Sequence, residues 1–209
     1  MITINIESAG KKFHREWIFR NISLQIEGRE KVAVTGNNGS GKSTLLQIIS
    51  GFQSLTSGTI TFQDNQRKIE SADRFRYVSY AAPYLELPEH YTLEELLAFQ
   101  GSFKPFLPNL TQEDILSLLE LRGADQKSIR NFSSGMKQRV KLALAIFSSA
   151  PVLLLDEPLS NLDKAGIGWY RRILPTYTAE KTVIICSNFI EDETEICHKR
   201  LILSNQEEQ

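Results

Sequence analysis

The chain has 209 residues, of which 41% are hydrophobic and 23% charged, values typical of a globular protein with an ample core. Its 24 basic and 25 acidic side chains leave a net charge of -1, which argues against a nucleic-acid partner. Residues 1–6 alternate like a strand rather than a signal peptide, and no apolar run approaches the ~20 residues that span a bilayer. We expect a cytoplasmic protein that reaches a membrane only through a partner.

Two kinds of periodicity divide the chain into a strand-rich core and a helical middle. Apolar runs predict strands over 2–8, 18–26, 31–35, 58–62, 77–80, 152–155, 182–186 and 200–203, with helices over 43–50 and 164–174. Between residues 92 and 149, apolar side chains recur every three or four positions, which predicts helices over 93–99, 112–121 and 136–147. We expect an α/β core at about 1–85 and 150–209, interrupted by a helical subdomain at about 86–149.

A glycine-rich segment between the predicted strand 31–35 and helix 43–50 fits the pattern G-x-x-x-x-G-K-S. Glycines there let successive N–H groups turn toward phosphate oxygens, and the helix start adds the positive end of its dipole. Lys42 would reach the β- and γ-phosphates, and the Ser43 hydroxyl would bind Mg²⁺. A glycine-rich turn without a ligand is the alternative. The strand–loop–helix context favours nucleotide binding by Gly36, Asn37, Asn38, Gly39, Ser40, Gly41, Lys42, Ser43 and Thr44.

Two acidic residues follow the apolar strand 152–155. This strand would deliver Asp156 to the edge of the sheet where α/β proteins bind ligands, so that its carboxylate can hold Mg²⁺ directly or through water. Glu157 comes next and can orient an attacking water or accept its proton. The alternative is an Asp-Glu-Pro surface turn, which a chain that already has a phosphate loop makes the weaker interpretation.

A third segment, Asn-Phe-Ser-Ser-Gly-Met-Lys-Gln-Arg at 131–139, precedes a predicted helix. Ser133 can cap that helix, and N–H groups of Ser134, Gly135 and Met136 can bind an anion; a simple capping turn is the alternative. With this segment and Leu-Ser-Asn-Leu-Asp at 159–163, the chain resembles the ATP-binding cassette (ABC) family over nearly its whole length. The resemblance implies a phosphate-loop NTPase core of mixed β-sheets flanked by helices. It also implies that two cassettes pair head to tail, each signature segment closing over the other's ATP.

The same resemblance assigns two further residues. Phe13 takes the position of the aromatic residue that stacks on adenine, although packing against Trp17 and Phe19 is an alternative use of its ring. Asp163 matches the aspartate through which the two ATP sites of a cassette dimer communicate.

Two positions depart from the family pattern. Asn188 stands where a histidine usually contacts the γ-phosphate, and its amide can donate a hydrogen bond but cannot carry charge or shuttle a proton. Losing one such donor costs ~10²–10³ in rate, and a partial substitute should cost less. The usual glutamine falls at Ala82 or Pro83, where no side chain can bind a metal. Either Glu157 suffices for slow hydrolysis, or the site binds ATP while a complete second cassette supplies the turnover.

The resemblance implies an ATP-hydrolysing subunit of an ABC transporter, of a short exporter-like type, held at the inner face of the cell membrane by a separate transmembrane subunit. That subunit would dock at residues 82–95 and the helical insert, unless the apolar side chains there pack the insert against the core instead. The alternatives are a non-transport ABC ATPase and a nucleotide-switched binding module with weak hydrolysis. The candidate docking residues are Tyr80, Tyr84, Leu85, Leu87 and Tyr91.

Overall fold

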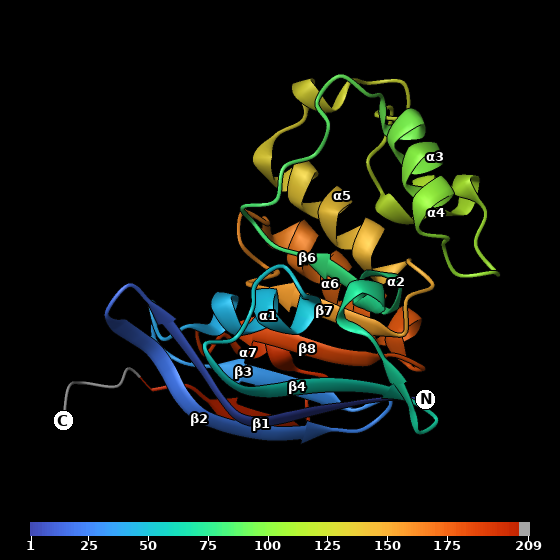
Figure 1. Ribbon diagram of the computed structural model, residues 1–209. Helices are drawn as coiled ribbons and strands as arrows, with labels where there is room; N and C mark the ends of the chain where they lie inside the picture. The colour runs from blue at the N-terminus through green and yellow to red at the C-terminus, as the bar shows by residue number, and fades with distance from the viewer. Residues whose placement is uncertain (205–209) are drawn as a thin grey trace.

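The structure, a computed structural model, describes residues 1–204 as two sheets with helices around them (Figure 1). One sheet is antiparallel, in the order β2-β1-β4-β5, and the other is parallel, in the order β6-β7-β8-β3-β9. The antiparallel strands are β1 (Ile2–Phe13), β2 (Glu16–Ile26), β4 (Ser57–Asp64) and β5 (Arg67–Ile69). The parallel strands are β3 (Lys31–Thr35), β6 (Val78–Ala81), β7 (Val152–Asp156), β8 (Thr182–Ser187) and β9 (Lys199–Ile202).

Helices connect the parallel strands, as right-handed crossovers in such sheets require. Helix α1 follows β3, helices α3 to α5 lie between β6 and β7, and α6 lies between β7 and β8. The helices are α1 (Lys42–Ser50), α2 (Arg74–Tyr77), α3 (Leu93–Phe103), α4 (Gln112–Leu119), α5 (Ser134–Ile146), α6 (Lys164–Thr178) and α7 (Glu191–Thr194), with short 3₁₀ turns at Ser71–Asp73 and Ile129–Asn131.

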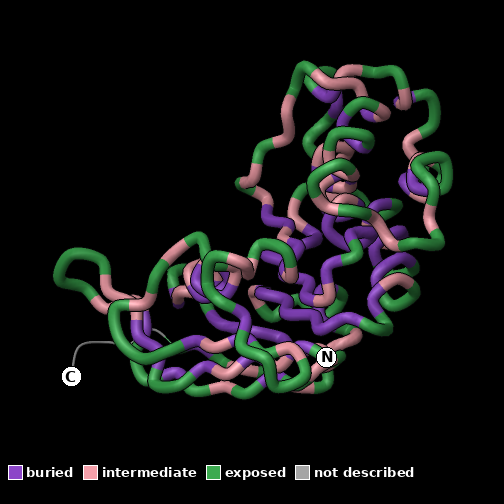
Figure 2. The backbone as a smooth tube through the Cα atoms, turned by 45° about the vertical axis from the view of Figure 1, so that its right-hand side comes forward, coloured by how far each residue is buried: buried purple, intermediate pink, exposed green. Residues whose placement is uncertain are grey.

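The parallel sheet is buried on both faces, which explains its continuous apolar strands (Figure 2). Side chains alternate along each strand, so that Val152 and Leu154 of β7 join one core, and Leu153 and Leu155 join the other. The first core also contains the antiparallel sheet and α1, whereas the second contains residues of α3, α4, α5 and α6. The helices between β6 and β7 therefore share a continuous core with one face of the sheet.

The predicted α/β class is confirmed, and the differences concern the ends of elements and a few short elements. The first strand runs on to Phe13 because β-bulges let it follow β2 past Ala9. The fourth helix stops at Leu119, where Glu120 takes a left-handed conformation, and α6 continues through Pro175 to Thr178. Strand β5 was not predicted, because three residues are too short to show a period. The proposed division near residues 86 and 149 stays a prediction.

None of the helices in residues 1–204 is both long enough and apolar enough to cross a bilayer.

Candidate nucleotide site

The glycine-rich segment joins the carboxyl end of β3 to the start of α1, as its pattern predicts. Gly41 lies immediately before the helix with a φ of 94°, a left-handed conformation that residues with a side chain rarely adopt. At Gly36 the constraint is space, because a Cβ atom would lie 2.3 Å from the carbonyl oxygen of Leu203 and 2.6 Å from Oγ of Ser40. Glycine at both positions preserves a loop whose successive N–H groups can surround a phosphate.

Lys42 opens α1, and its side chain folds back over this loop. Its Nζ donates to the carbonyl oxygens of Gly36 (2.8 Å) and Asn37 (3.0 Å), and the residue is 5% exposed. These carbonyls satisfy a buried ammonium group at the place where phosphate oxygens would offer a stronger, anionic partner. The structure thus brings Lys42 to the loop; its contact with phosphate stays a prediction.

Asp156 ends β7, and its carboxylate is buried. Burial raises the pKa of Asp156, while hydrogen bonding from Ser43 and Tyr84 and the charge of Lys42 act in the opposite direction. Its Oδ1 atom finds no hydrogen-bond partner among residues 1–204. An unpartnered carboxylate oxygen near a serine hydroxyl suits Mg²⁺, which prefers oxygen ligands. The two residues predicted for the metal are therefore neighbours at this edge of the sheet, and their binding of an ion stays a prediction.

Within residues 1–204, no group of three His, Cys, Asp or Glu side chains gathers into a protein-only metal site. A Mg²⁺ ion bound by Ser43 and Asp156 would complete its shell with nucleotide oxygens and water, as this ion usually does. The donor set therefore fits a metal that arrives with a nucleotide.

Glu157 and Asn188, predicted separately from the sequence, are in direct contact. The Asn188 amide donates from Nδ2 to Oε1 of Glu157 over 2.7 Å. Strands β7 and β8 are parallel neighbours in register, with Asp156 opposite Cys186, so the residues that follow them meet at one edge. Glu157 has a φ of 40°, an uncommon conformation for a residue with a side chain, and such strain gathers at functional sites.

The backbone after Glu157 is hydrogen-bonded to a buried acid, Glu193, that the sequence did not predict for the site. Oε1 of Glu193 accepts a hydrogen bond from the backbone N–H of Leu159 over 3.2 Å. Burial raises the pKa of Glu193 to about 7, although hydrogen bonds from Ser187 and Leu159 lower it. Its position in a run of four acidic or polar residues, 191–194, gives no sequence signal of burial.

The segment at 133–136 caps α5 as predicted. Ser133 has extended backbone angles, and its Oγ accepts a hydrogen bond from the N–H of Met136 over 3.2 Å. Gly135 lies against the loop that follows β7, because a Cβ atom on it would be 2.9 Å from the carbonyl oxygen of Asn161. Capping is thus established, and anion binding by Ser134, Gly135 and Met136 stays a prediction.

Asp163 caps α6, where its Oδ1 accepts from the N–H of Gly166 over 2.7 Å. Phe13, at the end of β1, is 41% exposed, whereas Phe19 is 2% exposed. The alternative of core packing for Phe13 is therefore wrong: its ring lies at the hairpin end of two long strands, 4.8 Å from the Lys11 ammonium. An exposed aromatic face is what stacking on a base requires.

The loop after β6 contributes Tyr84 to the site, although the sequence predicts another role for this residue. Ala82 is buried, and the Tyr84 hydroxyl beyond it donates to Oδ2 of Asp156 over 3.2 Å. The apolar neighbours of Tyr84 predict a place for it on a docking surface. The available signal was its place after a strand that adjoins β7, but sequence alone does not show which strands are neighbours.

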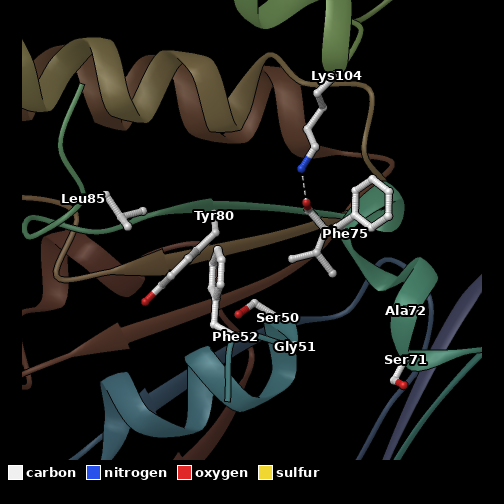
Figure 3. A pocket seen from close by; sticks show the side chains of 10 residues that line it. Ser50, Gly51, Phe52, Ser71, Ala72, Phe75, Tyr80, Leu85 and Lys104 are labelled. Carbon is white, nitrogen blue, oxygen red and sulfur yellow. Dashed lines mark hydrogen bonds between the residues drawn. The ribbon is translucent and has the colours of Figure 1, made fainter. Parts of the chain in front are cut away.

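A cavity of about 410 Å³ lies at the carboxyl end of α1, between that end, the turn before α2, strand β6 and Lys104 after α3 (Figure 3). Phe52, Phe75, Tyr80 and Leu85 supply its apolar walls. At one end, Lys104 donates from Nζ to the carbonyl oxygen of Val78 over 2.5 Å, and burial lowers the pKa of that ammonium.

Comparison with known proteins matches residues 19–160 to the family model described as ABC transporter. An uncharacterized ABC transporter ATP-binding protein of Bacillus subtilis, YxlF, is 32% identical over 98% of this chain and 68% of its own length. The lantibiotic transport ATP-binding protein SrtF of Streptococcus pyogenes is 29% identical over 92% of this chain and 82% of its own.

A sulfate/thiosulfate import ATP-binding protein of Rhizobium meliloti is 30% identical over 96% of this chain and 57% of its own. An import protein thus matches about as well as the lantibiotic transport protein, and the expected exporter-like type is not singled out. Among solved structures, the dimeric bacterial ABC transporter cassette MJ0796 has a TM-score of 0.79 at 22% identity, covering 99% of this chain and 97% of its own. That likeness supports the fold.

Proposed function

Since this chain belongs to the ABC transporter family, as an ATP-binding and ATP-hydrolysing subunit, we propose that it works in a head-to-tail pair of cassettes. Each nucleotide would lie between the loop at 36–44 of one chain and the segment at 133–136 of the other. One observation carries this proposal: Lys42, Asp156, Glu157 and Asn188 meet at the carboxyl edge of the parallel sheet, whereas Ser133 caps a helix of the insert.

The phosphate loop binds the β- and γ-phosphates through its N–H groups and the first turn of α1. Lys42 exchanges the carbonyl oxygens of Gly36 and Asn37 for phosphate oxygens, which makes a stronger, charge-assisted contact. The adenine stacks on the exposed ring of Phe13.

Ser43 and Asp156 would hold Mg²⁺ together with the nucleotide. The ion would supply positive charge against the negative charge that develops on the phosphate oxygens. The buried position of Asp156 strengthens this attraction, because water cannot screen the carboxylate.

Glu157 orients the water that attacks the γ-phosphorus, and the bond to the oxygen between the β- and γ-phosphates breaks as that oxygen leaves with ADP. The Asn188 amide holds Oε1 of Glu157 in place but adds no positive charge near the phosphate. We expect hydrolysis to be slow, because Asn188 can neither compensate developing charge nor transfer a proton.

A separate transmembrane subunit is the proposed partner, and it would keep the protein at the inner face of the membrane. Aromatic residues remain exposed around the cavity of Figure 3, which is unusual for a solvent-facing surface. Phe52 is 70% exposed and Phe75 is 59% exposed. A short apolar helix of a membrane protein would cover these rings.

The decisive experiment compares ATP hydrolysis and dimerisation of the purified chain with those of Glu157→Gln. The variant should lose ~10²–10⁴ in kcat, since that is the usual contribution of a positioned acid or base. It should also form a dimer with ATP that is stable enough to be seen by light scattering after size exclusion. Hydrolysis that is unchanged in Glu157→Gln would contradict the role of Glu157 in orienting the attacking water. The proposed transmembrane partner has its own test: purification of the chain from membranes without any membrane protein would contradict it.

A further inference from the structure

We propose that Tyr84 is the positioning residue of the magnesium site, and that its hydroxyl holds the Asp156 carboxylate in the orientation that binds the metal. This inference rests on the proposed magnesium site at Ser43 and Asp156. The first two residues of the loop after β6, Ala82 and Pro83, have no polar side chain, so the loop's first polar group beyond the strand is the Tyr84 hydroxyl.

Three side chains from different elements meet at that hydroxyl. It donates to Oδ2 of Asp156 over 3.2 Å, and it accepts from Nε2 of Gln47, on α1, over 3.0 Å. The Tyr80 hydroxyl, from β6, is its third hydrogen-bonding partner. A hydroxyl with one proton and two lone pairs is saturated by this set, so the orientation of the Tyr84 proton is determined by its neighbours.

The direction of the Tyr84 proton decides which oxygen of the Asp156 carboxylate accepts a hydrogen bond. An ionised carboxylate can only accept and the Gln47 Nε2 group can only donate, so Tyr84 gives its proton to Oδ2 of Asp156 and accepts from Gln47 and Tyr80. Oδ1 is then the oxygen left without a partner among the described residues, in the same buried carboxylate that hydrogen bonding from Ser43 also reaches. One oxygen is thus held by the protein, and the other has no partner within residues 1–204 and is open to a metal ion. Such outer-shell hydrogen bonds orient the ligands of many metal sites.

Tyr80 connects this hydroxyl group to the neighbouring cavity. Its ring lines the cavity and lies 6.0 Å from the ring of Phe52, centroid to centroid (Figure 3). The same side chain that forms a wall of the cavity therefore helps to orient Tyr84. Both tyrosines act on the metal through Asp156 and need not touch it.

The test measures how strongly Mg²⁺ enhances the binding of a fluorescent ATP analogue, for the full chain and for Tyr84→Phe. This substitution keeps the ring and removes only the hydroxyl. The concentration of Mg²⁺ that gives half of the enhancement should rise by about 10-fold or more, since outer-shell partners of a metal ligand contribute 10–100-fold to metal affinity. Affinity for the analogue in the presence of a chelator should be unchanged, because the phosphate loop is intact.

Tyr177→Phe is the matched control, because this ring packs edge-on against Phe147, with 4.9 Å between ring centroids, in a different hydrophobic core from the one that Tyr80 packs against. It should leave the Mg²⁺ dependence as in the unmodified chain. Tyr80→Phe should raise the Mg²⁺ midpoint by less than Tyr84→Phe does, because Tyr84 keeps its contacts with Gln47 and Asp156.

Two outcomes distinguish a failure of this inference from a failure of the proposed magnesium site at Ser43 and Asp156. If the unmodified chain binds the analogue with no dependence on Mg²⁺, the magnesium site itself is wrong, and the role of Tyr84 falls with it. If the unmodified chain depends on Mg²⁺ and Tyr84→Phe has the same midpoint within twofold, the role of Tyr84 alone is overturned.

Discussion

The side-chain amide of Asn188 donates a hydrogen bond to the carboxylate of Glu157, with 2.7 Å between Nδ2 and Oε1. The contact ties the ends of β7 and β8 together at the point where an attacking water would lie. The Oδ1 atom of Asn188 is buried and has no hydrogen-bond partner within residues 1–204. The amide therefore has a free acceptor oxygen for a hydrogen-bond donor such as water, but it carries no charge.

Replacing Asn188 by histidine tests whether this amide limits the rate. An imidazole can keep a hydrogen bond to Glu157 and can also carry a positive charge, so we expect Asn188→His to raise kcat by about 10-fold or more. Steady-state release of phosphate at saturating Mg-ATP measures the effect. Asn188→Asp is the informative counterpart, because a second carboxylate facing Glu157 should lower kcat; if both variants match the unmodified chain, the contact has no part in the rate.

At Gly36 the expected effect is steric. Gly36→Ala places a methyl group within 2.3 Å of the carbonyl oxygen of Leu203, so the loop must move away from the strand edge. We expect about 1–3 kcal/mol lower free energy of unfolding, as overpacking usually brings, together with at least 10-fold weaker ATP binding. Gly168→Ala on α6 is the control, since the nearest atom to its added methyl group is 3.7 Å away. In that helix, alanine should stabilise by about 0.5–1 kcal/mol.

Phe13→Ala tests the stacking assignment. Base–aromatic stacking contributes about 1–3 kcal/mol, so the Kd for ATP should rise by roughly 5- to 100-fold, while Phe13→Tyr should bind normally. Because Phe13 is 41% exposed, its removal should leave thermal stability nearly unchanged. Phe103→Ala removes a ring that is 75% exposed and lies on the helical insert, and it should not affect ATP affinity. Equal Kd values for Phe13→Ala and the unmodified chain would place the adenine elsewhere.

Glu193 gives a prediction for the dependence of stability on pH. Its pKa is raised from 4.5 to about 7 by burial, so the folded chain holds a proton there that the unfolded chain releases near pH 4.5. Its contribution to the free energy of unfolding is thus fully present below about pH 4.5 and is lost as the pH rises to about 7. The loss amounts to roughly 3 kcal/mol at most, since one pKa unit corresponds to about 1.4 kcal/mol.

Glu193→Gln should remove this pH dependence, because a neutral amide keeps an oxygen for the Leu159 N–H and has no proton to lose. Urea unfolding at about pH 5 and about pH 8, compared between variant and unmodified chain, separates the contribution of Glu193 from those of other titrating groups. Glu191→Gln is the control on the same short helix, because that side chain is exposed. A variant that keeps the full slope would show that Glu193 is ionised in the folded protein at both pH values.

Local features of the sequence predicted the loop at 36–44, the strand that leads to Asp156, and the capping residue Ser133. Each depends on contacts within a few residues: a glycine that fits a turn, an apolar run, or a side chain that reaches the N–H three residues on. The residues that make such contacts are neighbours in the sequence, and the structure places them where their spacing indicates.

The pairing of Asn188 with Glu157, the exposure of Phe13 and the contact from Tyr84 to Asp156 were decided by the tertiary structure alone. The Asn188 pairing and the Tyr84 contact depend on which strands are neighbours. Strand β8 separates β7 from β3, and β6 lies on the other side of β7, an order that no local pattern contains. Parallel strands pair across long connections, so the residues that meet at their ends are far apart in sequence and meet only after the sheet has formed. The sequence by itself determined that this chain binds a nucleotide, and the sheet order decided which side chains gather at the edge where we propose a metal.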